Sequence, residues 1–404
     1  MKKIIFSCLI FLTVLFFSLA YAGGSEDQRI NLSHKPGEGL TIEKLDLEIK
    51  PGATYVIQGV SDPNNAKGAQ FSGAWRAELD VKKKFWEWGE AFVRLLAGGH
   101  KSVTNKINAF SNVDYNAHDS RGDISAHTFW YKQYLFKKQF TLALGKLDPT
   151  DWFDLNKYAD NHRTQFLGDI FNNSPLIDWP VNYSFGVHMD AAPESAKFIQ
   201  LAFDYLDADW KNIFQRSIFA WELNFRPAYL SGNGPVQRDG NYRLYGWLNN
   251  RPHAKLIQGG VSQADADNLN YGVGLSCDQM ITDVFGLFSR LGWQRPDVAN
   301  PENFATLEWM WTMGAQMKGE YWGRKFDALG MAVGQLFPSS EYKDAGHPAA
   351  AEGHAELYYN YKLNEYLALT PDLQFIWNPN GAAEHSQGGD GTVFVYGIRA
   401  QAYF

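Results

Sequence analysis

The end of the chain alternates with a period of two residues. The even-numbered positions from Phe394 to Phe404 are all apolar or aromatic, whereas the odd-numbered positions between them include Arg399 and Gln401. This period is that of a β-strand with two unlike faces. An apolar face that begins and ends in aromatic residues is what a strand needs when it faces lipid.

The same alternation recurs along the chain, for example over 367–377, 355–361, 219–225 and 75–81. It predicts sixteen strands, near 53–61, 70–81, 87–97, 124–136, 139–147, 182–190, 196–206, 216–228, 240–250, 270–279, 282–293, 308–320, 323–337, 351–362, 365–378 and 391–404. Bacterial outer-membrane barrels have even strand numbers, and sixteen strands leave an aqueous lumen. A soluble β-sandwich also alternates, but it has no need of aromatic residues at both strand ends.

The N-terminus predicts export from the cytoplasm. Lys2 and Lys3 precede an apolar run from Ile4 to Leu19 and the small-x-small triplet 20–22, which together are typical of a secretory signal over 1–22 rather than a retained anchor. Its removal leaves 35 basic and 44 acidic side chains, a net charge of −9, which argues against nucleic acid as a partner. No later stretch approaches 18 consecutive apolar residues, so the exported chain is either soluble or a transmembrane β-barrel.

Three regions follow from this pattern: the signal peptide over 1–22, an N-terminal periplasmic or lumenal arm over 23–51, and an all-β transmembrane barrel over 52–404. The arm shows no strong period. Predicted connections near 136–140, 191–196 and 362–365 are short, whereas 98–123, 148–181, 251–269 and 379–390 are long. Short turns at one end and long loops at the other are the topology of an outer-membrane barrel, with the long loops outside the cell.

The polar faces of the predicted strands supply the candidate site residues. In a barrel they line a water-filled channel, and in a sandwich they are an ordinary solvated surface. Mixed charges bias ions weakly but offer hydrogen bonds to a neutral polyol such as a sugar. The expected pore-lining residues are Arg76, Glu78, Asp80, Glu90, Arg94, Asp204, Glu222, Arg226, Arg243, Trp247, Arg290, Glu356, Asp372 and Arg399.

The connection over 148–181 is too apolar for a freely solvated loop. A structureless segment of this length in a compact domain is usually functional. Folded into the lumen, it would narrow the pore and present Asp148, Asp151, Asp154, Lys157, Asp160 and Arg163 to solutes. Inward-facing aromatics either stack on sugar rings or merely fill the wall, and both interpretations apply to Tyr245, Trp247, Phe288 and Tyr358.

Two stretches resemble the carbohydrate-selective porins of bacterial outer membranes, the OprB type. The first comprises 145–148, 153–154, 165–167, 172–173 and 179–180, and the second comprises 356–361, 369–376 and 378–379. The resemblance spans roughly 50–404 and implies a 16-stranded barrel that passes monosaccharides by diffusion, with loops folded inward. Ser174 departs from the pattern because it separates the Asn pair from Pro175, so substrate preference is not carried over.

Other functions stay open from the residues alone. The ten histidines are scattered, with no HExxH pair and no Gly-x-Ser-x-Gly elbow, but a hydrolase triad can assemble from distant positions. Asp265, Asp267 and Asn268 are either a calcium loop or a solvated acidic loop. We expect no enzyme activity, no metal site and no cofactor. The expected partners are small sugars and outer-membrane lipid, and a homotrimer is left open.

Overall fold

The computed structural model describes residues 32–35, 39–61, 70–100, 103–107, 109–115, 124–179, 185–207, 216–230, 238–262, 267–299, 306–347, 349–382 and 391–403. The signal peptide expected over 1–22, Asp265 of the 251–269 loop, and Phe404 lie outside these residues.

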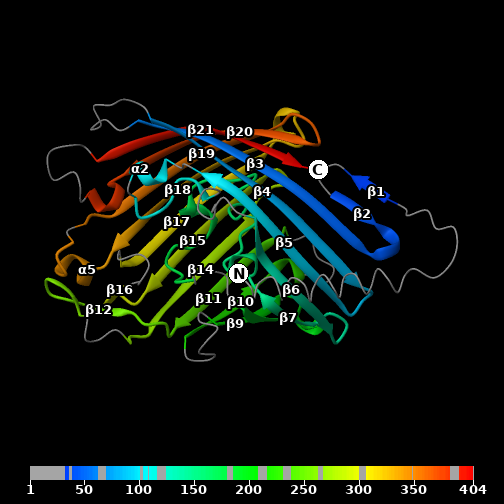
Figure 1. Ribbon diagram of the computed structural model, residues 1–404, viewed down its shortest axis with the longest axis horizontal. Coiled ribbons are helices and arrows are strands. Elements are labelled where there is room, and N and C mark those ends of the chain that lie inside the picture. Colours follow the sequence, from blue (N-terminus) through cyan, green and yellow to red (C-terminus); the bar gives the residue numbers. More distant parts are fainter. Residues whose placement is uncertain are drawn as a thin grey trace.

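Sixteen antiparallel strands close into a barrel (Figure 1). Consecutive strands pair with each other, and the last strand closes the sheet on the first, with Phe394 opposite Ser61 and Tyr403 opposite Gly52. The strands are β3 Leu47–Ser61, β4 Gln70–Phe85, β5 Gly89–His100, β6 Ser125–Leu135, β7 Phe140–Lys146, β8 Phe185–Ala191, β9 Ile199–Asp207, β10 Ser217–Phe225, β11 Gly240–Asn249, β14 Asn270–Met280, β15 Phe285–Gln294, β17 Leu307–Lys318, β18 Ala328–Pro338, β19 Glu352–Lys362, β20 Leu367–Trp377 and β21 Thr392–Tyr403.

Each strand predicted from the alternation is present, so the predicted count of sixteen is confirmed. The ends differ where the chain changes conformation. β18 begins at Ala328 instead of 323, because Gly319–Trp322 form a 3-10 helix (η5) and a turn follows it. β3 begins at Leu47, earlier than the predicted 53.

Side chains alternate between the lumen and the outside along each strand. In β14, Tyr271, Val273 and Leu275 are exposed on the outer surface, whereas the alternate residues from Asn270 to Ser276 are buried. β20 alternates in the same way, with Leu373 and Phe375 exposed. The outer surface is therefore apolar and suits lipid, and the polar residues point inward.

The N-terminal segment expected as an arm over 23–51 contributes to the sheet within its described part. β1 Leu32–Lys35 and β2 Gly39–Ile42 form a hairpin, and β2 pairs with the start of β3, where Leu40 lies opposite Ile49 (Figure 1). The pairing of β21 ends at Gly52, so the first residues of β3 would otherwise have an open edge on that side. The hairpin supplies the missing backbone hydrogen bonds.

The remaining described elements lie in the connections. A small three-stranded sheet of β12 Ala254–Ile257, β13 Gly260–Ser262 and β16 Val298–Ala299 joins two loops at the long-loop end. Within the described residues, no helix is long and apolar enough to span a membrane. The short helices are α2 Thr104–Ile107, α4 Asp169–Asn172, α5 Ser340–Asp344, η1 Glu43–Leu45, η2 Pro149–Asp151, η3 Glu194–Ala196, η4 Pro227–Tyr229 and η6 Pro379–Ala382.

Candidate functional site

The connection between β7 and β8 folds into the barrel. We call its described part, residues 147–179, the inner loop. It turns directly after β7, where the Asp148 carboxylate accepts hydrogen bonds from the backbone N–H of Thr150 at 3.0 Å and from its hydroxyl at 2.7 Å. Asp148 thereby caps η2, whose first residue is Pro149.

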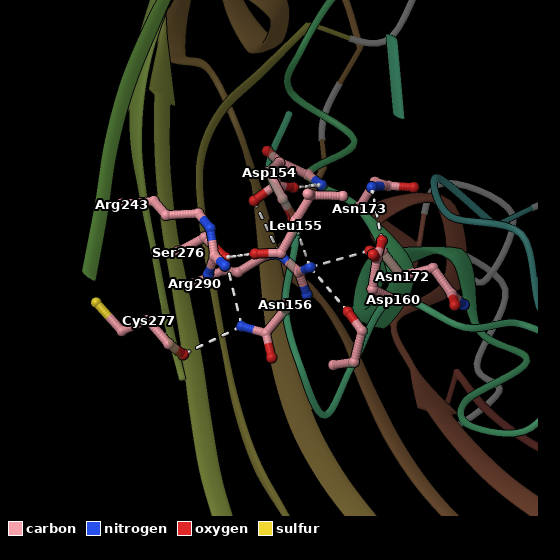
Figure 2. Close-up of polar contacts among 12 residues, drawn as sticks. Asp154, Leu155, Asn156, Asp160, Asn172, Asn173, Arg243, Ser276, Cys277 and Arg290 are labelled. Carbon is pink, nitrogen blue, oxygen red and sulfur yellow. Dashed lines mark hydrogen bonds and ion pairs between the residues drawn. The ribbon is translucent and has the colours of Figure 1, made fainter. Parts of the chain in front are cut away.

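Arg290 of β15 is the central anchor of the inner loop (Figure 2). Its Nε donates to the Asp154 carboxylate at 2.9 Å, and its two terminal nitrogens donate to the carbonyl oxygens of Phe171 at 2.9 Å, Asp154 at 2.9 Å, Ala159 at 2.8 Å and Asn172 at 3.0 Å. An irregular loop that is buried needs external donors for its carbonyls. The planar guanidinium, with five N–H groups, can serve several of them at once.

Two further wall charges hold the middle of the inner loop. Arg399 of β21 donates to the carbonyls of His162 at 2.7 Å and Gln165 at 2.8 Å. Glu356 of β19 accepts from the backbone N–H of Leu167 at 2.5 Å and of Gly168 at 2.9 Å. Charged side chains of the wall thus replace the backbone partners that this segment lacks.

The far end of the inner loop is held through Asp178. Its carboxylate accepts from Asn249 Nδ2 at 2.6 Å, Arg251 at 2.8 Å and His253 Nε2 at 2.6 Å. Burial pushes the pKa of Asp178 upward, but the hydrogen bond from His253 and the charge of Arg251 outweigh it and hold the pKa below its ordinary value. Asp178 therefore remains an anion at neutral pH.

A second segment, residues 103–115, lies against the inner loop. Glu352 of β19 accepts from the backbone N–H of Phe110 at 2.7 Å and of Ser111 at 3.0 Å. The backbone N–H of Tyr115 donates to the Leu167 carbonyl at 2.9 Å, which joins the two inward segments. Part of the 98–123 connection therefore also fills the barrel.

Apolar side chains fill the space between the inner loop and the wall. Tyr158, Phe166 and Phe171 of the loop cluster with Phe288 and Tyr358 of the wall. A second cluster joins Phe153 and Ile177 to Tyr245 and Trp247. The four wall aromatics that the sequence offers as stacking surfaces for sugars are thus covered by the loop and fill the wall.

These wall aromatics lie over glycines of the neighbouring strand. Tyr245 is opposite Gly274, and Tyr358 is opposite Gly330. A Cβ added at Gly330 would lie 2.3 Å from the Tyr358 ring. Glycine therefore lets the ring lie flat, which leaves room above it for the inner loop.

Most of the expected pore-lining residues are buried beneath or beside the inner loop, so in this conformation they hold the loop or one another instead of facing open water. The reason is that the loop covers one side of the lumen, which the alternation of the strands does not reveal. This set comprises Arg76, Glu78, Asp204, Glu222, Arg243, Trp247, Arg290, Glu356, Asp372 and Arg399. Asp148 and Asp154 of the loop are buried as well.

Some of these buried residues pair within the wall. His188 Nδ1 and the Asp204 carboxyl group share a hydrogen bond at 2.7 Å, and Arg243 pairs with Asp278 at 2.7 Å. Arg226 lies after the end of β10 and donates to the Lys197 carbonyl at 2.6 Å, so it orders a turn.

The wall opposite the covered side keeps partly exposed charges. Arg94 of β5 makes a two-pronged pair with Asp80 of β4, at 2.8 and 3.0 Å, and also approaches Asp151 of the inner loop at 3.4 Å. Asp151 is 36% exposed and Arg94 14% exposed. These residues bring the loop and the uncovered wall together.

Further charge pairs lie on the wall or join the wall to the inner loop. Glu78 pairs with both Arg76 and Arg163 of the loop. Glu90 pairs with Lys132 at 3.2 Å, and the loop residue Lys157 pairs with Asp239 at 3.2 Å. Asp160 follows Lys157 in the inner loop and is half-buried. Burial raises the pKa of Asp160 well above its ordinary value.

Sequence reasoning missed several residues of this region. Phe92, Trp130 and Lys132 share the inward face of β5 and β6 with the predicted Glu90 and Arg94. Their positions in the alternation could have identified them. Glu352 could have been identified in the same way, because it lies on the same inward face of β19 as Glu356. Asp178 had no such signal, because it belongs to the inner loop and its partner Arg251 is far away in the sequence.

No site for a metal is formed by the described residues, since they contain no group of three or more His, Cys, Asp or Glu side chains suitably placed. The free cysteine Cys277 lies in β14.

The comparisons with known proteins agree with this architecture. The family model of the carbohydrate-selective porin, OprB family, matches residues 66–404. The high-pH structure of Pseudomonas putida OprB is similar, with a TM-score of 0.71 and 14% identity over 89% of this chain and 95% of that one. Its low-pH structure gives a TM-score of 0.54, also at 14% identity, over 89% of this chain and 93% of that one.

The outer-membrane channel DcaP of Acinetobacter baumannii is also similar, with a TM-score of 0.52 and 11% identity over 91% of this chain and 99% of that one. No curated protein matches the sequence. These structural likenesses show the fold, a closed 16-stranded porin barrel. Because the family model covers most of the sequence, the chain belongs to the OprB family of carbohydrate-selective outer-membrane porins.

Proposed function

We propose that the protein lets small neutral sugars, monosaccharides such as glucose, diffuse passively through the part of the lumen that the inner loop leaves uncovered. The observation that carries this proposal is the partly exposed cluster of Arg94, Asp80 and Asp151, where the loop meets the opposite wall. Membership in the OprB family supports sugars as the solutes.

The chemistry of this cluster suits an uncharged polyol. Each cation faces at least one carboxylate, so the cluster offers donors and acceptors side by side while its net charge stays small. Sugar hydroxyls both donate and accept hydrogen bonds, and they can exchange partners along such a surface. Binding at each step stays weak, which lets the solute leave.

The family comprises channels, so transport needs no chemical step. Its members belong to the outer membrane, and the Lys2–Ala22 pattern supports export through a signal peptide for this chain. With the N-terminal end of β3 in the periplasm, the short turns lie on that side and the inner loop starts from the outer side.

The test is conductance across a planar bilayer that contains the purified, detergent-extracted protein. We expect stepwise channels whose current falls as glucose is added on either side. Liposomes that contain the protein should admit glucose faster than empty liposomes do. Correctly folded protein that forms no channels and admits no sugar would contradict the proposal.

A further inference from the structure

Three aromatic rings form a continuous surface on the wall of β5 and β6. Phe92 and Trp130 are cross-strand neighbours with ring centroids 5.1 Å apart and planes 24° apart. Trp152 of the inner loop meets Trp130 edge-on, with centroids 5.3 Å apart. We call these three residues the aromatic strip.

The aromatic strip faces the lumen. Phe92 lies in β5 between Glu90 and Arg94, on the same face as both. Trp152 belongs to a loop that is inside the barrel. Phe92 and Trp152 are both partly exposed, so their free surface meets the water of the pore, whereas Trp130 beneath them is buried.

Charged groups border the strip. The Lys132 ammonium lies 4.8 Å from the Trp130 ring centre and 4.6 Å from that of Trp152, and it pairs with Glu90 at 3.2 Å. The Arg94 guanidinium lies 5.4 Å from the Phe92 ring centre. The cations of Lys132 and Arg94 therefore lie over the rings, where they offer hydrogen-bond donors to a solute that reaches the exposed part of the strip.

Partly exposed rings with charged neighbours distinguish the aromatic strip from the other inward-facing aromatic residues. Tyr245, Trp247, Phe288 and Tyr358 are 1–4% exposed and pack under the inner loop, so solute cannot reach them. Phe92 and Trp152 pack on the cluster that contains Trp130, but both stay partly exposed to a lumen that is otherwise polar. A pyranose ring has apolar C–H faces that pack on aromatic planes and hydroxyls that bond to charged side chains.

We propose that Phe92 and Trp152, supported by Trp130, form a stacking subsite for a pyranose ring, with Glu90, Arg94 and Lys132 bonding its hydroxyls. This inference rests on the proposed passage of sugars. The subsite lies next to the Arg94, Asp80 and Asp151 cluster, on the side of the short β4–β5 turn. A sugar that has passed the cluster from the outer side therefore meets the strip next.

The subsite predicts a preference that pore size alone does not. Glucose and the open-chain polyol sorbitol are similar in size and hydroxyl content, but only glucose has a rigid ring with apolar faces. Wild-type protein should therefore be blocked by glucose at a lower concentration than by sorbitol.

The experiment compares the full-length protein with two variants in planar bilayers. Phe92→Leu keeps an apolar side chain and removes the flat ring. Phe288→Leu is the matched control, because Phe288 also faces inward but is covered by the loop. The readouts are single-channel conductance in salt alone and the concentrations of glucose and sorbitol that halve the current.

We expect Phe92→Leu to raise the half-blocking concentration of glucose about fivefold, which is the size of one aromatic stacking contact. The half-blocking concentration of sorbitol and the conductance in salt alone should change by less than a factor of about 1.5, because the free energy of one weak contact corresponds to a larger factor. Phe288→Leu should leave the ratio of glucose to sorbitol unchanged. If Phe92→Leu fails to form channels, Trp152→Leu gives the same comparison.

Failure of the subsite and failure of the proposed function give different results. If glucose blocks the wild type and both strip variants equally, the strip is not a sugar subsite and passage of sugars stands. If glucose affects neither the current nor liposome entry in the wild type, the proposed function itself is overturned.

Discussion

Arg290 and Asp154 form an ion pair at 2.9 Å with their side chains only 0% and 1% exposed. One partner belongs to the wall and the other to the inner loop, 136 residues apart in the sequence. A charge pair buried this completely is sensitive to loss of one member, because the remaining charge keeps the cost of desolvation without its partner. The position of the inner loop therefore depends on Arg290.

Replacing Arg290 with Gln should loosen the inner loop. The substitution removes the charge opposite Asp154 and most of the donors to the loop carbonyls, and we expect a loss of about 3–5 kcal/mol in the free energy that holds the loop. Single-channel conductance should rise or fluctuate between levels, and protease added from outside should cleave within 147–179.

The control for this prediction is Arg238→Gln. Arg238 pairs with Asp283 at 2.7 Å in an exposed position, where an ion pair contributes about 0–1 kcal/mol. The single-channel conductance of Arg238→Gln should match that of the wild type. A stable, protease-resistant Arg290→Gln channel with unchanged conductance would show that Arg290 does not hold the loop.

The barrel could be predicted from the sequence because each strand carries its own signal. Alternation assigns every residue to one of two faces, and this holds wherever one face meets lipid, as in β14 and β20. The first residues of β3 and the hairpin before it lacked that signal, because they extend past the pairing with β21.

The roles of the inward residues could not be predicted in the same way. Alternation shows that Arg290 and Arg94 both point inward, but not that the inner loop covers Arg290 and leaves Arg94 partly exposed. That difference depends on contacts between residues more than a hundred positions apart. For the same reason, Trp247 was expected to meet solute and is instead under the loop.

Deleting residues 150–178 should enlarge the pore. The deletion removes Asp151 and Arg163 from the uncovered surface and exposes Glu356 and Arg399 to water, where their charges are readily solvated. We expect the barrel to fold, since consecutive strands and the β3–β21 closure do not involve the loop. Single-channel conductance should rise clearly, and unchanged conductance in a folded barrel would remove this loop from the constriction.

Gly330→Ala should destabilise the barrel through Tyr358. The new Cβ would lie 2.3 Å from the ring, and Tyr358 cannot move away because Phe166 of the inner loop packs against it at 4.8 Å between ring centroids. We expect a loss of about 1–3 kcal/mol, as for other overpacked sites. Urea unfolding in detergent measures the loss. Gly260→Ala is the control, since nothing lies within 4 Å of a Cβ there, and equal midpoints for the two variants would contradict this packing argument.

The pH dependence of stability should carry a contribution from His162 of the inner loop. Burial lowers the pKa of His162 well below its ordinary value, and the charges of Arg76 and Arg163 lower it further. The unfolded chain takes up a proton near pH 6.5 that the folded protein does not, so stability is complete above that pH and is lost as the pH falls below it. One such group changes the unfolding free energy by at most about 1.4 kcal/mol per pH unit.

Urea unfolding at pH 7.5 and 5.5 measures this loss, and His162→Gln should reduce it because glutamine does not titrate. His162 stacks on Tyr115 with ring centroids 4.9 Å apart, so the variant will lower stability at both pH values through lost packing. The informative quantity is therefore the difference in unfolding free energy between pH 7.5 and pH 5.5, because the lost packing contributes equally at both and cancels. An equal difference in wild type and His162→Gln would show that other groups account for the acid sensitivity.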